Sequence, residues 1–392
     1  MIDSHHHLRT TPLEAASGMV LGLDPYASAL PPAHPSGPIE ALRQRLIEAL
    51  ETAPCLVQFS GGRDSSCALA LAFRVAREEG LPLPVPITYR FPAAPEVDES
   101  YWQEMIVRHI GVDDWIRLEF TDDLDYVGPV AQRAMRSVGL IWPANGHMLV
   151  PALDRAREGT LETGMDGDGL FNWRWAPAVN MIARRDSPSL EAFKNFLYYL
   201  TPSLPARLVD GRRTLHRLSW MRPEPRREVL DRWSDQRARE PRRWDKRVHF
   251  YNRMRYASVL RWGGKLLAEQ CGANVLHLFM DPSFLSSLAK SNGPSGFRDR
   301  TTSLKELFSD LVPEALLERR DKPVFHLYWG ELSRRFADEW RGEGVDPDIV
   351  DHDRLWSEWH SPYPSFMTAL LLQSAWLARE DGIEETIESR WQ

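Results

Sequence analysis

The sequence predicts an α/β protein, with a doubly wound parallel sheet in the first half of the chain and a mainly helical second half. An apolar run at residues 56–59 breaks into a Ser/Gly loop and continues as an Ala/Leu-rich stretch, which is the pattern of a buried strand, a loop and a packed helix. Strand and helix patterns then alternate to about residue 120, as in parallel sheets. From residue 189 to about 267 the pattern is helical and rich in Trp and Arg.

The elements of the first half can be placed from their residue patterns. Apolar residues at helical spacing mark amphipathic helices, whereas short apolar and aromatic runs mark strands. Because parallel sheets bind ligands beyond the carboxyl ends of their strands, the loop after residue 59 is a candidate ligand site. In chain order we expect a helix over 39–51, strands over 56–59 and 83–91, a helix over 98–109, a strand over 114–120 and a helix over 148–158.

The loop Ser60-Gly-Gly-Arg-Asp-Ser-Ser66 has the composition of an anion site. Gly61 and Gly62 lack the Cβ atoms that would block close approach, and Ser60, Ser65 and Ser66 add hydroxyl donors. The free N–H groups of the following helix point at whatever occupies the loop, so a phosphate fits there. The loop is neither a Walker A motif nor the G-x-G-x-x-G pattern of dinucleotide sites. An ordinary strand-to-helix turn is the alternative.

A second loop is expected at the same edge of the sheet, because residues 161–171 are acidic and glycine-rich. Asp166 and Asp168 in this segment could share with Asp64 the task of holding Mg²⁺ against phosphate oxygens. The pattern therefore predicts a magnesium site beside the anion site.

Composition is that of an ordinary soluble protein. The hydrophobic fraction is 43% and the charged fraction 26%, and the chain is long enough for roughly two to three domains. No run approaches ~18 uninterrupted apolar residues and the N-terminus lacks a signal-peptide pattern, so we expect a cytoplasmic protein. Cys55, Cys67 and Cys271 form no CxxC pair and no disulfide framework, so neither a zinc site nor an oxidising compartment is indicated. Cys55 and Cys67 sit in apolar runs, which favours small core residues over nucleophiles.

Charge is unevenly distributed along the chain. The net charge is −7, but residues 207–261 carry 17 Lys/Arg and 7 Asp/Glu, a net charge of +10. Two interpretations stay open for this segment. It is either a solvated helical face whose charges pair with one another, or a surface that receives an acidic partner, whether peptide or nucleic acid.

Four segments, taken in order, resemble the synthetase domain of the asparagine synthetase family, which also includes β-lactam synthetases and lasso-peptide cyclases. The first segment is also similar to the SGGxDS loop of the PP-loop ATP pyrophosphatases. The resemblance to the synthetase domain runs from about residue 40 to about residue 330. The segments are Ser60-Gly-Gly-Arg-Asp-Ser-Ser66, Thr163-Gly-Met-Asp-Gly-Asp168, Phe279-Met-Asp-Pro282, and Leu311-Val-Pro-Glu314 with Arg319-Arg-Asp-Lys322.

The resemblance implies a PP-loop core and a two-step reaction. A carboxylate attacks the α-phosphorus of ATP to give an acyl adenylate and pyrophosphate, and an amine then displaces AMP to form an amide. By the same resemblance the first loop and Gly164 bind ATP, Asp64 and Asp168 hold Mg²⁺, and Lys322 is catalytic. The implied organisation is an N-terminal arm over 1–40, an ATP-binding core over 41–180 and a helical part over 181–392.

Two positions depart from the family pattern. Members that use glutamine carry a cysteine after the initiator Met and a glutaminase domain, whereas this chain has Ile2 and about 40 residues before the synthetase domain. Glutamine hydrolysis is therefore not expected. Met165 stands where asparagine synthetases have Glu and β-lactam synthetases have Tyr. A thioether cannot act as a base, so the amine proton must leave by another route.

The resulting hypothesis is an AMP-forming amide or lactam synthetase. Its carboxylate and amine substrates are peptides or small metabolites, and no membrane partner is expected. A PP-loop ligase that modifies tRNA is one alternative, which the basic segment favours and the later motifs oppose. A non-catalytic relative that binds ATP is the other alternative, and Met165 favours it.

Overall fold

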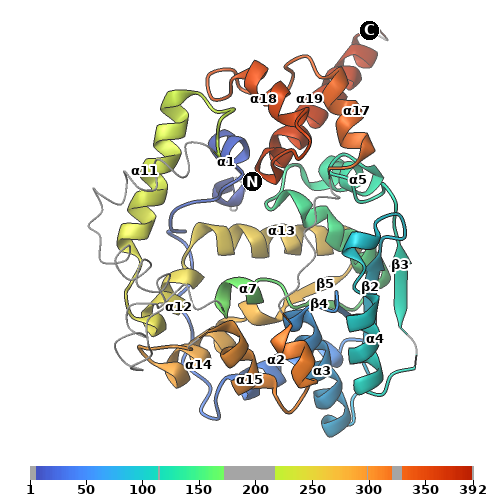
Figure 1. Ribbon diagram of the computed structural model, residues 1–392, viewed down its shortest axis with the longest axis vertical. Coiled ribbons are helices and arrows are strands. Elements are labelled where there is room, and N and C mark those ends of the chain that lie inside the picture. The colour runs from blue at the N-terminus through green and yellow to red at the C-terminus, as the bar shows by residue number, and fades with distance from the viewer. Residues whose placement is uncertain (1–5, 114, 172–216, 298, 320–328, 391–392) are drawn as a thin grey trace.

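The computed structural model describes residues 6–113, 115–171, 217–297, 299–319 and 329–390. Its centre is a five-stranded sheet in which every strand runs parallel to its neighbours (Figure 1). Helices cover both faces of this sheet, which confirms the predicted doubly wound α/β fold. In sheet order the strands are β3 (Ile116–Glu119), β2 (Val85–Arg90), β1 (Cys55–Gln58), β4 (Thr160–Thr163) and β5 (Asn274–His277).

Helices account for most of the remaining described chain, and the predicted helical second half is confirmed for its described part. Short 3₁₀ helices lie at His6–Leu8, Pro95–Val97, Ala144–Leu149, Leu278–Met280 and, as η6, at Phe366–Thr368. The α-helices are α1 (Pro12–Ser17), α2 (Pro38–Leu50), α3 (Arg63–Glu79), α4 (Ser100–His109), α5 (Pro129–Val138), α6 (Val150–Arg155), α7 (Gly167–Leu170), α11 (Pro223–Arg239), α12 (Trp244–Asn252), α13 (Arg255–Cys271), α14 (Pro282–Asn292), α15 (Arg300–Phe308), α16 (Glu314–Glu318), α17 (Glu331–Glu339), α18 (His352–Trp359) and α19 (Ala369–Arg390).

The strand order changes direction at β1. This strand pairs with β2 on one side, where Leu56 lies opposite Val85, and with β4 on the other, where Cys55 lies opposite Thr160. The chain leaves β1 toward one half of the sheet and returns through β4 to build the other half, so the boundary between β1 and β4 is the topological switch point. Open parallel sheets bind ligands outside the carboxyl ends of the strands at this point.

The two faces of the sheet bury different side chains. Cys55 and Val57 of β1 join an apolar cluster with α2, α3 and α4, whereas Leu56 joins a second cluster with α6 and α13. Successive side chains of a strand point to opposite faces, which accounts for this division. All three cysteines are buried and none forms a disulfide, as expected of core residues, and burial raises the pKa of Cys55 to about 12.

One prediction about the sheet was wrong. Residues 161–171 were expected to form a loop, but Thr160–Thr163 form the interior strand β4, and the loop begins at Gly164. The sequence was misleading because this strand carries a carboxylate and two hydroxyls, which are seldom fully buried.

Glu162 of β4 is nevertheless 0% exposed, and neither of its carboxylate oxygens has a hydrogen-bond partner among the described residues. Burial raises the pKa of Glu162 well above its usual value, which favours the protonated form.

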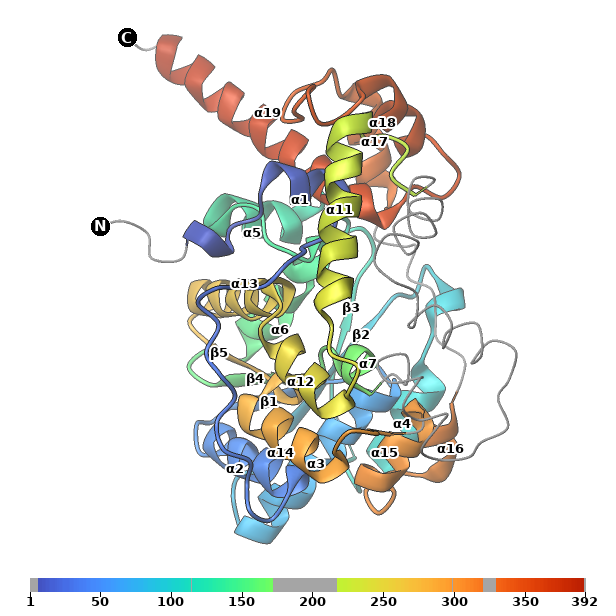
Figure 2. The same ribbon diagram turned by 90° about the vertical axis from the view of Figure 1, so that its left-hand side faces the viewer.

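A second apolar core lies in a helical unit that combines the N-terminal arm with the C-terminal helices, in the upper part of Figure 2. Within it α1 packs against α11 and η6, and Trp220 donates a hydrogen bond from Nε1 to the carbonyl of Ala16 (2.8 Å). Arg255 of α13 pairs with Glu14 of α1 (2.7 Å), which holds the arm against the helices of the sheet. None of the helices that the structure describes is long and apolar enough to cross a membrane.

Glu162 gives the fold a specific pH dependence. The folded state keeps this carboxyl protonated at pH values where the unfolded chain has released the proton, so the free energy of unfolding falls as pH rises above the ordinary pKa of about 4.5. The free energy of unfolding is measured in urea at several pH values above 4.5 for wild type and for Glu162→Gln. We expect it to fall more steeply with pH in the wild type, by up to about 1.4 kcal/mol per pH unit. Glu119→Gln, at an exposed position of β3, is the matched control. Parallel stability curves for wild type and Glu162→Gln would contradict a buried protonated carboxyl.

Candidate active site

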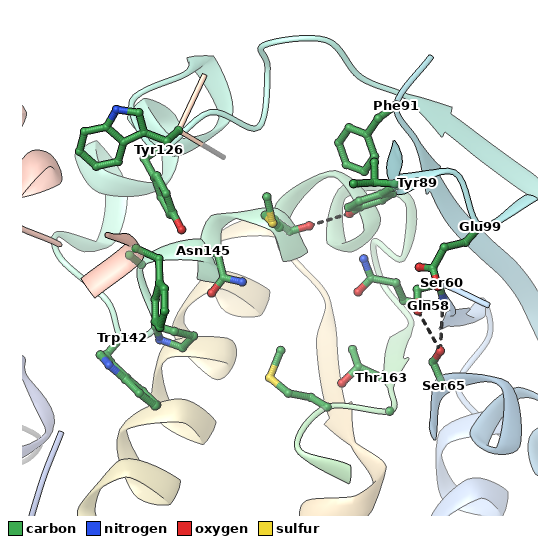
Figure 3. Close-up of a pocket in the computed structure, with 18 of the residues that line it drawn as sticks. Gln58, Ser60, Ser65, Tyr89, Phe91, Glu99, Tyr126, Trp142, Asn145 and Thr163 are labelled. Atoms are coloured by element: carbon green, nitrogen blue, oxygen red, sulfur yellow. Dashed lines mark hydrogen bonds between the residues drawn. The ribbon is translucent and has the colours of Figure 1, made fainter. Parts of the chain in front are cut away.

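A cavity of about 760 Å³ opens at the carboxyl ends of β1 and β4, at the switch point of the sheet. Figure 3 shows Ser60 and Ser65 of the loop after β1 on one side of it, and Tyr126 and Trp142 on the opposite side. Thr163, at the end of β4, lines the cavity between the two sides. A concave site of this size can hold a nucleotide together with part of a second ligand.

The conformation of the loop after β1 depends on Gly61. Its φ of +90° lies in the left-handed region, and a Cβ atom there would lie 3.1 Å from Cβ of Trp102 and 3.2 Å from the backbone nitrogen of Gln103. Gly62 has extended backbone and precedes α3 as its N-cap, without a side-chain cap. The first N–H groups of α3 are therefore not capped by a side chain, and such groups suit an anion.

The three serines of this loop have different surroundings. Ser65 Oγ accepts a hydrogen bond from the N–H of Ser60 (3.2 Å) and donates to the carbonyl of Gly62 (3.3 Å), and Ser60 Oγ accepts from the N–H of Gly62 (3.1 Å). Both of these serines line the cavity. Ser66 is fully buried and does not line it, because the first turn of α3 directs this residue into the core.

The two predicted metal ligands meet in a smaller cavity of about 270 Å³, which shares Ser65 and Gly164 with the larger one. One guanidinium nitrogen of Arg300 lies 2.6 Å from Oδ2 of Asp64 and 2.5 Å from Oδ1 of Asp168. These two carboxylate oxygens are therefore no more than about 5 Å apart. The switch point thus brings together two acidic residues that are remote in the sequence.

The loop after β4 can approach α3 this closely because residues 164 and 167 have no Cβ. A Cβ at Gly164 would lie 2.7 Å from Cα of Ser65, and one at Gly167 would lie 2.6 Å from Cγ of Asp64. Either contact is too short for packed atoms, so a larger residue would displace the loop. Gly164, predicted as part of the nucleotide site, lines both cavities and also acts as a spacer between the two loops.

Two arginines face this corner from different elements. Arg300 begins α15, and Arg63 begins α3 and lines the same cavity. Burial lowers the pKa of Arg63, and the nearby Arg300 lowers it further, whereas Asp64 and Asp168 act in the opposite direction. Guanidinium groups beside a cavity of this kind suit phosphate oxygens. The sequence analysis missed Arg300, because an arginine at the start of a short helix forms no motif.

Arg319 connects the segment after α16 to the loop after β1. Its guanidinium pairs with Glu99 (2.7 Å) and donates to the carbonyl of Gly61 (2.9 Å), and both charged side chains are buried. The motif that begins at Arg319 was recognised in the sequence, but its contact with the loop was not predicted. Lys322, the predicted catalytic residue of that motif, lies outside the described residues.

Asp166 has different partners from Asp64 and Asp168. Its carboxylate accepts hydrogen bonds from the hydroxyls of Tyr251 and Tyr256, the latter at 2.7 Å. Burial raises the pKa of Asp166, and the two tyrosine hydroxyls partly oppose that effect. Among the described residues, no group of three or more His, Cys, Asp and Glu side chains could hold a metal ion. The candidate metal ligands are therefore the pair Asp64 and Asp168.

This pair fits the way in which proteins hold Mg²⁺ with a nucleotide. Mg²⁺ takes octahedral oxygen ligands at about 2.1 Å, commonly one or two carboxylates together with substrate phosphates and waters. Asp64 and Asp168 already converge on one positively charged nitrogen, and both line a cavity that is also lined by Ser60 and Gly62 of the loop after β1. Arg300 occupies the position between them, so a metal ion there requires the Arg300 side chain to shift.

The basic segment 207–261 is described from residue 217 onward, where it forms α11, α12 and the start of α13. Some of its arginines pair within the segment, as in Arg232 with Glu228 (2.6 Å) and Arg243 with Asp245 (2.6 Å). Such exposed pairs contribute little stability but neutralise part of the positive charge. They fit the interpretation of a solvated helical face, and an acidic partner stays a prediction.

Comparison with known protein families gives a match over most of the chain. A family model described as asparagine synthase matches residues 40–376. The match contains all four motifs and continues into the C-terminal helices, so the resemblance inferred from the motifs is confirmed. No curated protein matches the chain.

Gly164→Ala tests the close approach of the two loops. The added methyl group would overlap the first turn of α3, so we expect the free energy of unfolding to fall by about 1–3 kcal/mol in urea. Gly263→Ala is the matched control, because a Cβ there would lie 3.5 Å from its nearest neighbour and alanine is the better helix former. If both variants unfold with the same free energy, the loops are not in the contact described.

Proposed function

The chain belongs to the asparagine synthase family of ATP-dependent carbon–nitrogen ligases, and we propose that it forms an amide or lactam bond through an acyl adenylate, releasing AMP and pyrophosphate. The amine comes from a peptide or a small metabolite rather than from glutamine. The main support is that the phosphate-type loop, the pair Asp64 and Asp168, and the large cavity lie together at one edge of the sheet.

The loop after β1 suits the β- and γ-phosphates of ATP, which leave as pyrophosphate. The N–H groups at the start of α3 and the hydroxyls of Ser60 and Ser65 can donate to phosphate oxygens. Arg63 and Arg300 place positive charge where negative charge develops on the leaving group. The α-phosphorus then faces the larger cavity, where the substrate carboxylate attacks it.

Asp64 and Asp168 would hold Mg²⁺ at the same corner. When bound, the ion would supply charge neutralisation for the triphosphate and the pyrophosphate. Arg300 would then exchange its two carboxylate partners for phosphate oxygens, which keeps its charge paired throughout.

The second step needs an acceptor for the proton of the attacking amine. Met165 lines both cavities, at the position where the family has Glu or Tyr. Its thioether accepts no proton, so the family's usual base is missing at this position. We therefore propose that the amine proton leaves by another route and that the chain does not make free asparagine.

One assay separates the alternative functions, because they differ in the substrate that release of AMP and pyrophosphate requires. Purified chain is incubated with ATP, Mg²⁺ and pools of carboxylic acids and amines, with tRNA in a parallel reaction, and AMP and pyrophosphate are measured. We expect both products from the acid and amine pool without tRNA. Products that require tRNA would instead support the PP-loop ligase acting on tRNA, for which the basic segment is the argument. ATP binding without AMP in any reaction would support the non-catalytic relative.

Asp168→Asn tests the proposed metal site. The Asp168 side chain is 48% exposed, so the change should leave the fold intact. Because removing even an outer partner of a metal ligand weakens binding about 10- to 100-fold, we expect the Mg²⁺ concentration for half-maximal AMP release to rise by at least about tenfold. Asp154→Asn is the matched control, since Asp154 pairs with Arg133 (2.6 Å) and does not line either cavity. An unchanged Mg²⁺ dependence in Asp168→Asn removes Asp168 from the site.

Lys322→Ala tests the catalytic residue carried over from the motif. Losing one preorganised positive donor typically lowers turnover ~10²- to 10³-fold, and we expect that loss in amide formation with ATP binding unchanged. Lys322→Arg should restore little activity, because a planar guanidinium does not replace a compact ammonium. Lys265→Ala, at a side chain of α13 that is 71% exposed, is the control. Turnover of Lys322→Ala within about twofold of wild type would mean that the carried-over role is wrong.

A further inference from the structure

The large cavity has two ends of different chemistry. Ser60, in the loop after β1, and Ser65, in the first turn of α3, stand at one end, and Tyr126 and Trp142 stand across the cavity from them (Figure 3). This second end is formed mainly by large aromatic and apolar side chains, which come from the segments after β3 and from the C-terminal part of the chain. They are Tyr126, Trp142, Trp329, Phe366, Met367 and Leu370. The uncharged amide of Asn145 lies beside Tyr126 and Trp142 (Figure 3).

Packing holds the aromatic end in place. Tyr126 and Trp329 belong to the second apolar core and are 6% and 5% exposed, and their rings meet edge to face with centroids 6.2 Å apart. Leu370 is 2% exposed. Trp142 donates a hydrogen bond from Nε1 to the carbonyl of Gly18 (3.0 Å). An apolar surface fixed in this way binds a matching group without first ordering its own side chains.

The described residues that line this cavity provide no free charge to pair with a second charged group on a substrate. They include no Lys, Arg or His, and their one carboxylate, Glu99, is already paired with Arg319 (2.7 Å). Burial raises the pKa of Tyr126, so its hydroxyl stays neutral. A charged group buried there would lose its water without gaining an opposite charge from the described part of the chain, which is strongly unfavourable.

We propose that the acid activated by this chain is a monocarboxylic acid whose body is a large aromatic or branched apolar group, seated against Tyr126, Trp142 and Trp329. This substrate class rests on the proposed function, since it assigns the body of the molecule whose carboxylate reacts. A carboxylate oxygen forms a bond to the α-phosphorus of ATP, and the bond from that phosphorus to pyrophosphate breaks. Seating the body at the aromatic end directs the carboxylate toward the phosphate end.

ATP–pyrophosphate exchange tests this class on the full chain without knowledge of the amine. The acids used are 3-phenylpropanoate, 4-phenylbutanoate and indole-3-propanoate, against acetate, succinate and aspartate. We expect exchange with at least one aromatic acid at about tenfold or more the rate of any of the other three, because even single methylenes in apolar pockets change rates about 10- to 200-fold. Comparable exchange with succinate or aspartate would overturn the substrate class and leave the proposed function standing. A chain that binds ATP but exchanges with none of the six acids would also overturn it, whereas a chain that does not bind ATP would overturn the proposed function itself.

A pair of exposed aromatic residues supplies the matched variants. Phe366 lines the cavity and is 74% exposed, whereas Tyr363 is 76% exposed and lines a neighbouring cavity instead. Both can be changed to alanine without disturbing a core. We expect Phe366→Ala to raise KM for the aromatic acid at least about threefold with KM for ATP unchanged, and Tyr363→Ala to change neither. Equal effects of the two variants on the acid would contradict the assignment of the aromatic end.

Discussion

The close approach of β4 to β1 is the constraint on which the site depends. Glycines make it possible at both ends of the strand: a Cβ at Gly159 would lie 1.9 Å from the carbonyl oxygen of Pro54, and one at Gly164 would lie 2.7 Å from Ser65 Cα. The first contact fixes the register of the two strands, since the N–H of Thr160 donates to that same carbonyl (3.0 Å). The second brings Asp168 beside Asp64. A few missing methyl groups thus determine whether the two loops form one site.

The charges at this corner are balanced before any ligand arrives. Arg300 pairs with Asp64 and Asp168, and Arg319 pairs with Glu99. Under the proposed function, a nucleotide would exchange partners with existing ion pairs rather than meet isolated charges, which would lower the penalty for desolvating either side. The larger cavity differs, because aromatic residues of the second core, such as Tyr126 and Trp329, line its far end. The proposed function and substrate class would place the phosphates and the body of the acid in these two different environments.

The sequence alone predicted much of the α/β core, because the strands at 56–59, 83–91 and 114–120 and the helices beside them have strong local patterns. It failed at β4, where a buried carboxyl at Glu162 resembles a loop residue unless its environment is known. It placed Asp64 and Asp168 at one edge from topology, but Arg300 and the aromatic end depend on contacts between distant segments. Residues such as Tyr126 and Trp329 have no shared motif, and they become neighbours only when the helical unit packs against the sheet.

Transfer of oxygen from the acid to AMP is the most direct measurement of the proposed chemistry. An acid that supports pyrophosphate exchange is labelled with ¹⁸O in both carboxylate oxygens and converted in the presence of an amine. If the carboxylate attacks the α-phosphorus and the amine then displaces AMP, one ¹⁸O atom must appear in the phosphate of AMP, and the amide must keep the other. Unlabelled AMP, or ADP together with labelled inorganic phosphate, would show that the bond is formed without an acyl adenylate.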